Sequence, residues 1–275
     1  MIAAWSMYDW PEIEVHTDRL WGALRDALLE AGLDPPADRT RDDDFMHVWT
    51  APNLLFAQTC GLPYSRFLID QVTLIGTPHY ACEGCEGPNY SSAIVVRHDS
   101  EIEKLHESVG LTVAFNEPWS QSGRGAWHRL SLVGRKKTVF GRVLKTGAHR
   151  ASLRAVAAGE ADICAVDAVC WALFQRYDPE PTAKLRVLEW TEKTPGLPVI
   201  SHAGLSEDDR SKIQVVFEHV ISNLDTPTKD SLMLSGFTRT SESDYRPLAE
   251  TLAQATAEWD PLLGALSDKT SSSLG

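Results

Sequence analysis

The chain has 275 residues, enough for two lobes of ordinary size, and its 43% hydrophobic and 23% charged residues are typical of a globular protein. Its formal net charge of -12 repels phosphate backbones and anionic lipid, which argues against nucleic acid as a partner. Its apolar stretches are too short to span a bilayer, so we expect no membrane insertion.

The first third of the chain alternates predicted strands with helical sequence. Thr17 is the predicted cap of a helix with a leucine at every fourth position and Gly32 after its end. Gly76 and Pro78 are the predicted end of the third strand. The predicted strands are Met1–Tyr8, Leu54–Gln58 and Val72–Ile75.

The same alternation continues after a loop rich in glycine and cysteine at 82–88. Further strands are predicted over Ser92–Arg97, Leu111–Phe115, Phe140–Leu144, Ala161–Val166 and Leu185–Leu188. Helices are predicted over Ser120–Leu130, Ala151–Ala158 and Val169–Gln175. From Asp208 the pattern is mainly helical, up to a polar tail that starts at Ser267.

This alternation predicts an α/β fold of two lobes, each a mainly parallel sheet flanked by helices. The second group of elements lies inside the first in sequence. We therefore expect residues 1–91 and 189–275 to form lobe 1, and residues 92–188 to form an inserted lobe 2. Hinge strands near 92–97 and 185–188 would let the lobes close around a ligand.

The candidate binding residues of lobe 2 lie between a strand and the helix that follows it. Four of them are consecutive: Ser120, Gln121, Ser122 and Gly123. Hydroxyls and free N–H groups at a helix start suit anionic oxygens, although an ordinary serine cap has the same pattern. His149 could donate to an anion or be a surface histidine, and Asp167 could accept from a ligand or cap a helix.

Lobe 1 contributes candidates by position at strand carboxyl ends, namely Tyr8, Gln58 and Thr59. Tyr64 and Tyr80 are weaker candidates that could equally serve packing. In open α/β sheets the carboxyl edge of the strands is where ligands bind. We therefore predict that Tyr8 and Thr59 face one cleft, opposite the candidates of lobe 2.

The five cysteines fit a reducing compartment better than a disulfide framework, because their number is odd and two of them lie in apolar runs. Cys82 and Cys85 have the spacing of half a zinc site or of a redox pair, and also fit a structural loop. A complete ligand set is not apparent, so we predict neither a metal site nor a cofactor.

Three segments in order carry a family resemblance: Ser-Gln-Ser-Gly, Thr-Gly-Ala-His and Gly-Glu-Ala-Asp-Ile-Cys-Ala-Val-Asp. Together they resemble the phosphate/phosphonate-binding component of ABC transporters, most strongly from Ser92 to Trp171. The resemblance implies the type II periplasmic binding fold, a small anionic ligand such as phosphonate, phosphate or phosphite, and an ABC permease as partner.

The same resemblance implies roles for single residues. Ser120, Gln121 and Ser122 match the helix start that binds the phosphonate oxygens. His149 matches the ligand histidine, and Asp167 the acidic residue after the next strand. Tyr8 and Thr59 match contacts from the first lobe.

Two other functions remain compatible with the same fold, an enzyme and an intracellular ligand sensor. An enzyme would use His149 and Asp167 as a proton-transfer pair, or Cys60 as a nucleophile. We expect binding without catalysis, because the chain shows no nucleophile-elbow, P-loop or metalloprotease motif. The segment Met1–Tyr8 has no basic region or cleavage pattern, which predicts a cytoplasmic protein, or a periplasmic one if a leader has been removed.

Overall fold

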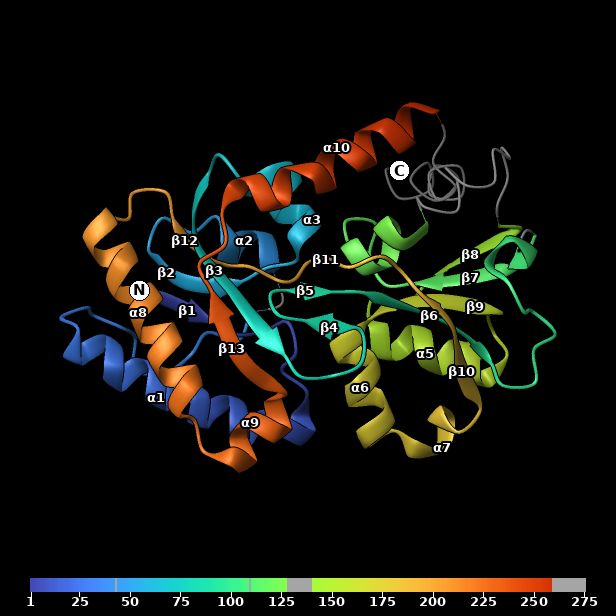
Figure 1. The fold of residues 1–275 in the computed structure, drawn as a ribbon, viewed down its shortest axis with the longest axis horizontal. Helices are drawn as coiled ribbons and strands as arrows, with labels where there is room; N and C mark the ends of the chain where they lie inside the picture. Colours follow the sequence, from blue (N-terminus) through green and yellow to red (C-terminus); the bar gives the residue numbers. More distant parts are fainter. Residues whose placement is uncertain (43, 109, 128–139, 259–275) are drawn as a thin grey trace, which may run out of the picture. The chain divides into compact units, whose positions relative to one another are not determined.

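The computed structural model describes residues 1–42, 44–108, 110–127 and 140–258. The described chain divides into two compact units, the first made of residues 1–90 and 194–248, and the second of residues 91–193 and 249–258. Each unit contains a five-stranded sheet with helices packed on it (Figure 1). Both predicted hinge strands lie inside the second unit, and their role as hinges stays a prediction.

The large sheet of the first unit has the strand order β1-β2-β12-β3-β13. Its strands are β1 (Ile2–Ala4), β2 (Leu54–Gln58), β3 (Val72–Tyr80), β12 (Val199–His202) and β13 (Leu234–Thr238). Only β1 and β2 pair in parallel, and the other pairs are antiparallel. A smaller sheet joins β4 (Cys85–Glu86), β5 (Asn89–Tyr90) and β11 (Thr194–Pro195).

Helices of the first unit pack on this sheet and on one another. They are α1 (Glu14–Glu30), α2 (Phe45–Trp49), α3 (Gly61–Pro63), α8 (Glu207–Asn223), α9 (Thr226–Leu232) and the start of α10 (Glu242–Glu258), with the short turns η1 (Pro11–Ile13) and η2 (Tyr64–Leu68). Helix α1 contacts α8 and α9. Phe217 of α8 stacks on Trp5 and Phe237 and meets Phe56 edge-on. This one aromatic side chain therefore packs α8 against β2, β13 and the residue that follows β1.

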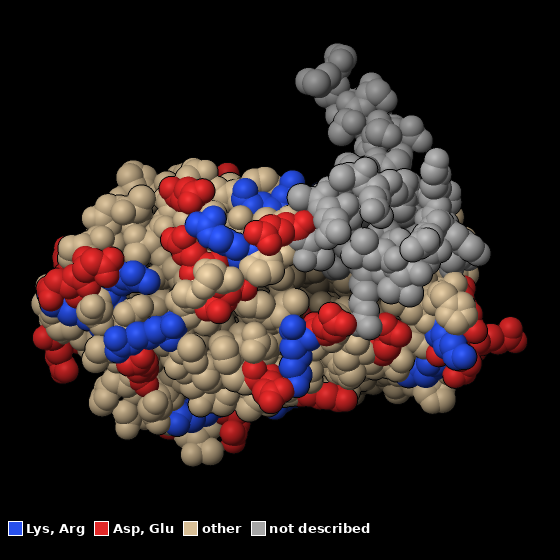
Figure 2. Space-filling view, turned by 45° about the horizontal axis from the view of Figure 1, so that its top comes forward, with Lys and Arg blue, Asp and Glu red and all other residues tan. Residues whose placement is uncertain are grey.

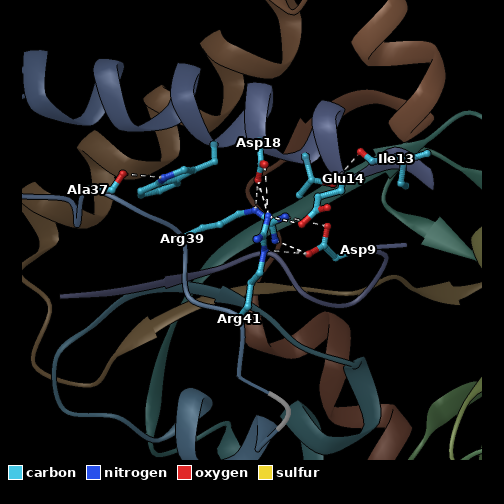
Figure 3. Close-up of polar contacts among 9 residues, drawn as sticks. Asp9, Ile13, Glu14, Asp18, Ala37, Arg39 and Arg41 are labelled. Carbon is cyan, nitrogen blue, oxygen red and sulfur yellow. Dashed lines mark hydrogen bonds and ion pairs between the residues drawn. The ribbon is translucent and has the colours of Figure 1, made fainter. Parts of the chain in front are cut away.

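A cluster of ion pairs fixes the loop that follows β1 (Figure 3). The guanidinium of Arg39 is almost completely buried and donates to Asp18 at 2.7 Å and to both carboxylate oxygens of Asp9. Arg41 pairs with Asp18 at 3.0 Å and with Glu14 at 2.6 Å. Because a buried guanidinium is costly unless its donors are satisfied, Arg39 holds this loop against the first turns of α1.

The sheet of the second unit has the strand order β10-β6-β9-β7-β8. Its strands are β6 (Ser92–Arg97), β7 (Thr112–Phe115), β8 (Arg142–Lys145), β9 (Ile163–Asp167) and β10 (Leu185–Trp190). Strand β7 is parallel to β8 and β9, whereas β6 is antiparallel to β9 and β10.

Helices cover the second sheet as well, and an aromatic pair closes its core. They are α5 (His149–Ala158), α6 (Ala168–Tyr177) and α7 (Pro179–Thr182), with the short turns η3 (Leu105–Ser108) and η4 (Gln121–Gly125). Helix α5 packs on β6, β7 and β9. Trp127 and Phe140 meet edge-on at 4.9 Å in a core with Ile94, Val113 and Ile163.

Acidic and basic side chains are interspersed on the face of the molecule drawn in Figure 2. Among the described residues, oppositely charged side chains form ion pairs, such as Lys212 with Asp208 at 2.6 Å and Arg239 with Glu218 at 2.7 Å. On this face the negative net charge is therefore not gathered into one broad acidic patch. In the part of the chain that the structure describes, we find no helix with the length and apolar character needed to cross a bilayer.

The α/β prediction is confirmed, but the prediction of mainly parallel sheets is wrong. The difference in the first unit comes from β12 and β13, which lie late in the chain and run antiparallel to β3. Strand β13 lies in the region predicted to be mainly helical. The predicted polar tail from Ser267 lies outside the described residues.

Three predicted boundaries are also wrong. The first strand is β1 alone and stops at Ala4. Thr17 lies inside α1, where it is buried and donates to the carbonyl of Ile13, so it does not cap the helix. Strand β3 continues through Gly76 and Pro78, because it changes partner there from β12 to β13. A Cβ atom on Gly76 would lie 2.5 Å from the carbonyl oxygen of Thr238, so glycine is required by a close neighbour and not by a turn.

Candidate functional site

Three parallel strands place their carboxyl ends at one edge of the sheet in the second unit. Asn116 follows β7, the segment from Thr146 follows β8, and Asp167 ends β9. The loops after β7 and β8 are joined to each other. The backbone N–H and the hydroxyl of Thr146 both donate to the carbonyl of Phe115 at 2.9 Å, and the N–H of Gly147 donates to the carbonyl of Asn116 at 3.2 Å.

The serine segment folds tightly against this edge. Ser120 and Ser122 are each only 2% exposed, and their hydroxyl oxygens lie 3.4 Å apart. The Ser120 oxygen accepts the backbone N–H of Gly123 at 3.0 Å. A Cβ atom on Gly123 would lie 2.2 Å from Oδ1 of Asn116, so only glycine fits there. The segment 121–125 is the π-helical turn η4, and the predicted helix beyond residue 127 lies outside the described residues.

His149 is the first residue of α5 and contacts the serine segment. Its Nε2 lies 2.9 Å from the hydroxyl of Ser122 and 3.3 Å from Nδ2 of Asn116. Its Nδ1 is buried and has no hydrogen-bond partner among the described residues. Burial lowers the pKa of His149 to about 4, so the imidazole is neutral at pH 7.

The amide of Asn116 indicates which ring nitrogen carries the proton. Because Nδ2 can only donate, Nε2 of the neutral ring is the acceptor and Nδ1 carries the hydrogen. In that tautomer the hydroxyl of Ser122 also donates to Nε2. The Nδ1–H group of His149 is then a buried donor in need of an acceptor, which is a costly state for a polar group.

Helices α5 and α6 differ in how their first turns are capped. The cap residue of α5 is Ala148, which has no side chain that can accept a hydrogen bond. Asp167, only 3% exposed, caps α6 by accepting the N–H groups of Val169 at 2.8 Å and Cys170 at 3.3 Å. The capping role considered for Asp167 from sequence is therefore present, and its contact with a ligand stays a prediction.

The candidates of the first unit form a group of their own. Nε2 of Gln58 donates to the hydroxyl of Tyr80 at 2.9 Å, and Tyr8 meets the ring of Tyr80 edge-on at 5.0 Å. Thr59 is fully buried; its hydroxyl donates to the carbonyl of Cys60, and its N–H to that of Pro198. Tyr64 lies elsewhere in the core, edge-on to Tyr245, which agrees with the packing role considered for it.

Sequence reasoning therefore found Ser120, Ser122 and His149, which the structure brings together, and missed Asn116. Asn116 carries the same signal that selected Asp167, a polar residue directly after a predicted strand. Gln121, nearly buried beside the two serines, stays a predicted contact. That the groups of the two units face one cleft also stays a prediction.

A sequence model of the family described as "ABC transporter, phosphonate, periplasmic substrate-binding protein" matches residues 56–245, which is more than half of the chain. The chain belongs to this family. As a phosphonate-type substrate-binding protein, it is the ligand-binding component of an ABC transport system, and its family implies a permease as partner. A search of curated sequences found no significant match.

Solved structures agree with this family in fold. The chain is similar to PhnD1 from Prochlorococcus marinus in complex with methylphosphonate, with a TM-score of 0.72, 14% identity, and 93% and 98% of the two chains covered. It is also similar to a binding protein component of an ABC phosphonate transporter from Pseudomonas aeruginosa, with a TM-score of 0.72, 16% identity, and 94% and 87% covered.

A chemically different ligand is bound in another structure of the same fold. XAC2383 from Xanthomonas citri bound to ATP has a TM-score of 0.69 and 16% identity, with 94% and 97% of the chains covered. At these identities the likeness establishes the type II periplasmic binding fold. Within the described residues of this phosphonate-type binding protein, no cluster of three or more His, Cys, Asp or Glu side chains is placed to hold a metal ion.

Proposed function

We propose that this substrate-binding protein holds a small oxyanion of the phosphonate, phosphate or phosphite type at the carboxyl edge of β7, β8 and β9. The observation that carries the proposal is the convergence of Ser120, Ser122 and His149 at the uncapped start of α5. Methylphosphonate, the ligand named for the similar structure of PhnD1, belongs to the same chemical class.

Neutral donors can offset the cost of taking such an anion out of water. The hydroxyls of Ser120 and Ser122 can rotate toward a ligand oxygen, and the Nδ1–H group of His149 needs an acceptor. The first-turn amides of α5 add the positive end of a ten-residue helix. Several donors of this kind stabilise a buried anion without a lysine or arginine, in a chain whose net charge is -12.

The first unit would supply further contacts to the bound molecule. Oε1 of Gln58 is buried and has no hydrogen-bond partner among the described residues, and it lies on the side chain that donates to Tyr80. A carbonyl oxygen of this kind accepts from an amine or from a protonated ligand oxygen. We propose Tyr8, Gln58 and Thr59 as this second set, and Asp167 as a contact only for ligands that carry a donor.

We also propose that the ligand is bound and not transformed. An enzyme could use the contact of Ser122 with His149 as a nucleophile–base pair. The low pKa of His149, about 4, makes it a poor general base at neutral pH, because efficient bases have a pKa near the working pH. Cys60 is buried, and Asp167 accepts the first N–H groups of α6, so neither side chain is an exposed reactive group.

The test is a thermal-shift and calorimetric screen of the full chain with methylphosphonate, phosphite, phosphate, methanesulfonate and acetate. We expect at least one phosphorus oxyanion to bind, and Ser122→Ala to weaken that binding. Phosphorus NMR of the recovered ligand should show it unchanged after long incubation. Conversion of the ligand would favour the enzyme. Binding that neither Ser120→Ala nor Ser122→Ala weakens would place the anion elsewhere.

The family supports a proposal about the location and the protein partner. We propose a periplasmic location and an ABC permease as the acceptor of the ligand, and the intracellular sensor is the competing case. Fractionation of cells that produce the protein from its natural gene separates the two. Recovery with the periplasmic fraction supports the transport role, and recovery with the cytoplasm supports the sensor.

A further inference from the structure

Two cysteine side chains touch each other in the loop of the first unit that follows β3. The Sγ atoms of Cys82 and Cys85 lie 3.5 Å apart, and both residues are half-buried. The other three cysteines of the chain are buried. Cys82 and Cys85 are therefore the most accessible thiols in the described part of the protein, and neither belongs to the proposed oxyanion site.

The backbone holds the two residues at the distance that a disulfide requires. The N–H of Cys85 donates to the carbonyl of Cys82 at 3.1 Å, which closes a β-turn with Gly84 at its third position. Gly84 has a φ of 87°, the left-handed conformation that a type II turn needs there. The Cα atoms at the ends of a β-turn lie within about 7 Å, which overlaps the range of roughly 4.4–6.8 Å found across disulfides.

The loop is also fixed on both sides of the turn. Cys85 begins β4 and pairs with Tyr90 of β5, and the N–H of Ala81 donates to the carbonyl of Met233 at 2.7 Å. The N–H of Gly196 donates to the carbonyl of Pro88 at 2.8 Å. Because these bonds leave the turn in place, forming an S–S bond of about 2.05 Å needs only rotation of the two side chains.

A zinc site fits the same surroundings less well. No third His, Cys, Asp or Glu among the described residues joins the two thiols in a metal-binding group. His79, the nearest histidine in sequence, directs its Nε2 to the hydroxyl of Thr238 at 2.7 Å. Structural zinc needs four ligands, of which this loop offers two.

We propose that Cys82 and Cys85 are a reversible dithiol–disulfide pair that accepts oxidation from a disulfide oxidant, such as glutathione disulfide. One thiolate attacks the oxidant, forms a mixed disulfide and releases one glutathione thiol. The second cysteine then attacks the sulfur of the first and expels the other glutathione thiol. The two cysteines lose two protons and two electrons, and the oxidant is reduced to two thiols.

Oxidation would lock the turn between two functional parts of the chain. Strand β3 ends at Tyr80, which carries the hydrogen bond from Gln58, and β5 ends at Tyr90, where the chain leaves the first unit. The disulfide closes a ring across residues 82–85 and removes the freedom of this turn to open. The pair stands independently of the oxyanion proposal, since it depends only on contacts within the loop.

The test uses the full chain in glutathione buffers that range from fully reduced to fully oxidised. After denaturation and alkylation, the number of reactive thiols should fall from five to three as the buffer becomes oxidising. Peptide mapping should place a loss of about 2 Da, two hydrogens, on the peptide that contains residues 82–85. Adding reductant should restore all five thiols.

Single variants separate an intramolecular bond from general oxidation. Cys82→Ser and Cys85→Ser should each keep a stable mixed disulfide with glutathione, because the resolving thiol is absent. Cys60→Ser is the matched control and should oxidise like the wild type. Five reactive thiols, counted after denaturation of protein that was oxidised in the folded state, would overturn the proposal. So would a disulfide from either cysteine to another position, or tight binding of one zinc ion to the reduced pair.

Discussion

The proposed oxyanion site leads to a specific prediction for Ser122, whose hydroxyl lies between the hydroxyl of Ser120 and the imidazole of His149. The single hydroxyl hydrogen of Ser122 bonds Nε2 of His149 in the free protein and would turn to the anion on binding, so Ser122→Ala deprives the bound anion of one donor. Leaving a buried polar partner unsatisfied costs about 1–3 kcal/mol. We therefore expect the dissociation constant to rise by about 5-fold to 150-fold.

A loss of folding stability also lowers the measured affinity, so a second buried serine serves as the control. Ser152 in α5 is fully buried and its hydroxyl lies 2.6 Å from that of Thr146, on the same helix as His149. Ser152→Ala should lower the free energy of unfolding by about 0.5–1.5 kcal/mol, as loss of a hydrogen bond does, and leave the affinity almost unchanged.

Isothermal titration calorimetry with the tightest ligand of the screen gives the affinities, and urea denaturation gives the stabilities. If Ser122→Ala is folded and binds within twofold of the wild type, the serine does not contact the anion and the site is misassigned. If Ser152→Ala weakens binding as strongly as Ser122→Ala, the effect reports on the position of α5 and not on a lost donor.

The remaining predictions concern pH and packing. Affinity, corrected for titration of the ligand, should stay flat from pH 8 to pH 6 because the pKa of His149 is about 4; a steep rise in calorimetric titrations over that range would mean that the imidazolium binds. Burial opposes ionisation of Asp178, but the hydrogen bonds of Arg150 and Arg154 outweigh it and lower its pKa. The ionised carboxylate of Asp178 therefore contributes stability above about pH 4, and this contribution is lost as the pH falls through the folded pKa. Asp178→Asn should make the denaturation temperature fall less steeply at acid pH, and an unchanged fall would exclude this ion pair as its cause. Gly76→Ala should lower the free energy of unfolding by about 1–3 kcal/mol, since its Cβ would meet β13; an unchanged urea midpoint would contradict that.

Local patterns in the sequence predicted the fold class and the central strands. Leu54–Gln58 and Ser92–Arg97 are continuous apolar runs, and both are strands with the predicted bounds. Thr17 was misassigned because α1 starts earlier, at Glu14, after the turn η1, which has no side-chain cap at its own start. A capping residue can be recognised only when the helix actually begins with one.

Strand direction could not be predicted from the same patterns. Whether β12 and β13 run parallel or antiparallel to β3 depends on where the chain returns after the second unit, which no local window contains. The glycine at position 76 shows the same difficulty. It looks like the end of a strand, whereas its cause is a carbonyl 162 residues later in the chain, at Thr238.

The candidate site was predicted in part because its residues sit at strand ends, where the sequence pattern changes. Ser122 and His149 were both selected on that ground, but their contact with each other was not foreseen. The contact depends on Thr146 and Gly147 bonding to the end of β7, which brings the two loops together. Asn116 also follows a predicted strand, but an asparagine there is a common turn residue, and its contact with the imidazole is visible only in the structure.

The neutral state of His149 changes how an acidic protein can bind an anion. A permanently charged lysine would attract any anion at long range, whereas hydroxyls, amides and a neutral imidazole act only on an oxygen at hydrogen-bond distance. The number and direction of acceptor oxygens on the ligand then decide its affinity. A site of this kind should discriminate by shape among anions of equal charge. Methylphosphonate and methanesulfonate differ in protonation and in charge at neutral pH, so a comparison of these two mixes charge with shape. Phosphite and phosphate, compared at one pH where each carries the same charge, are the more informative pair.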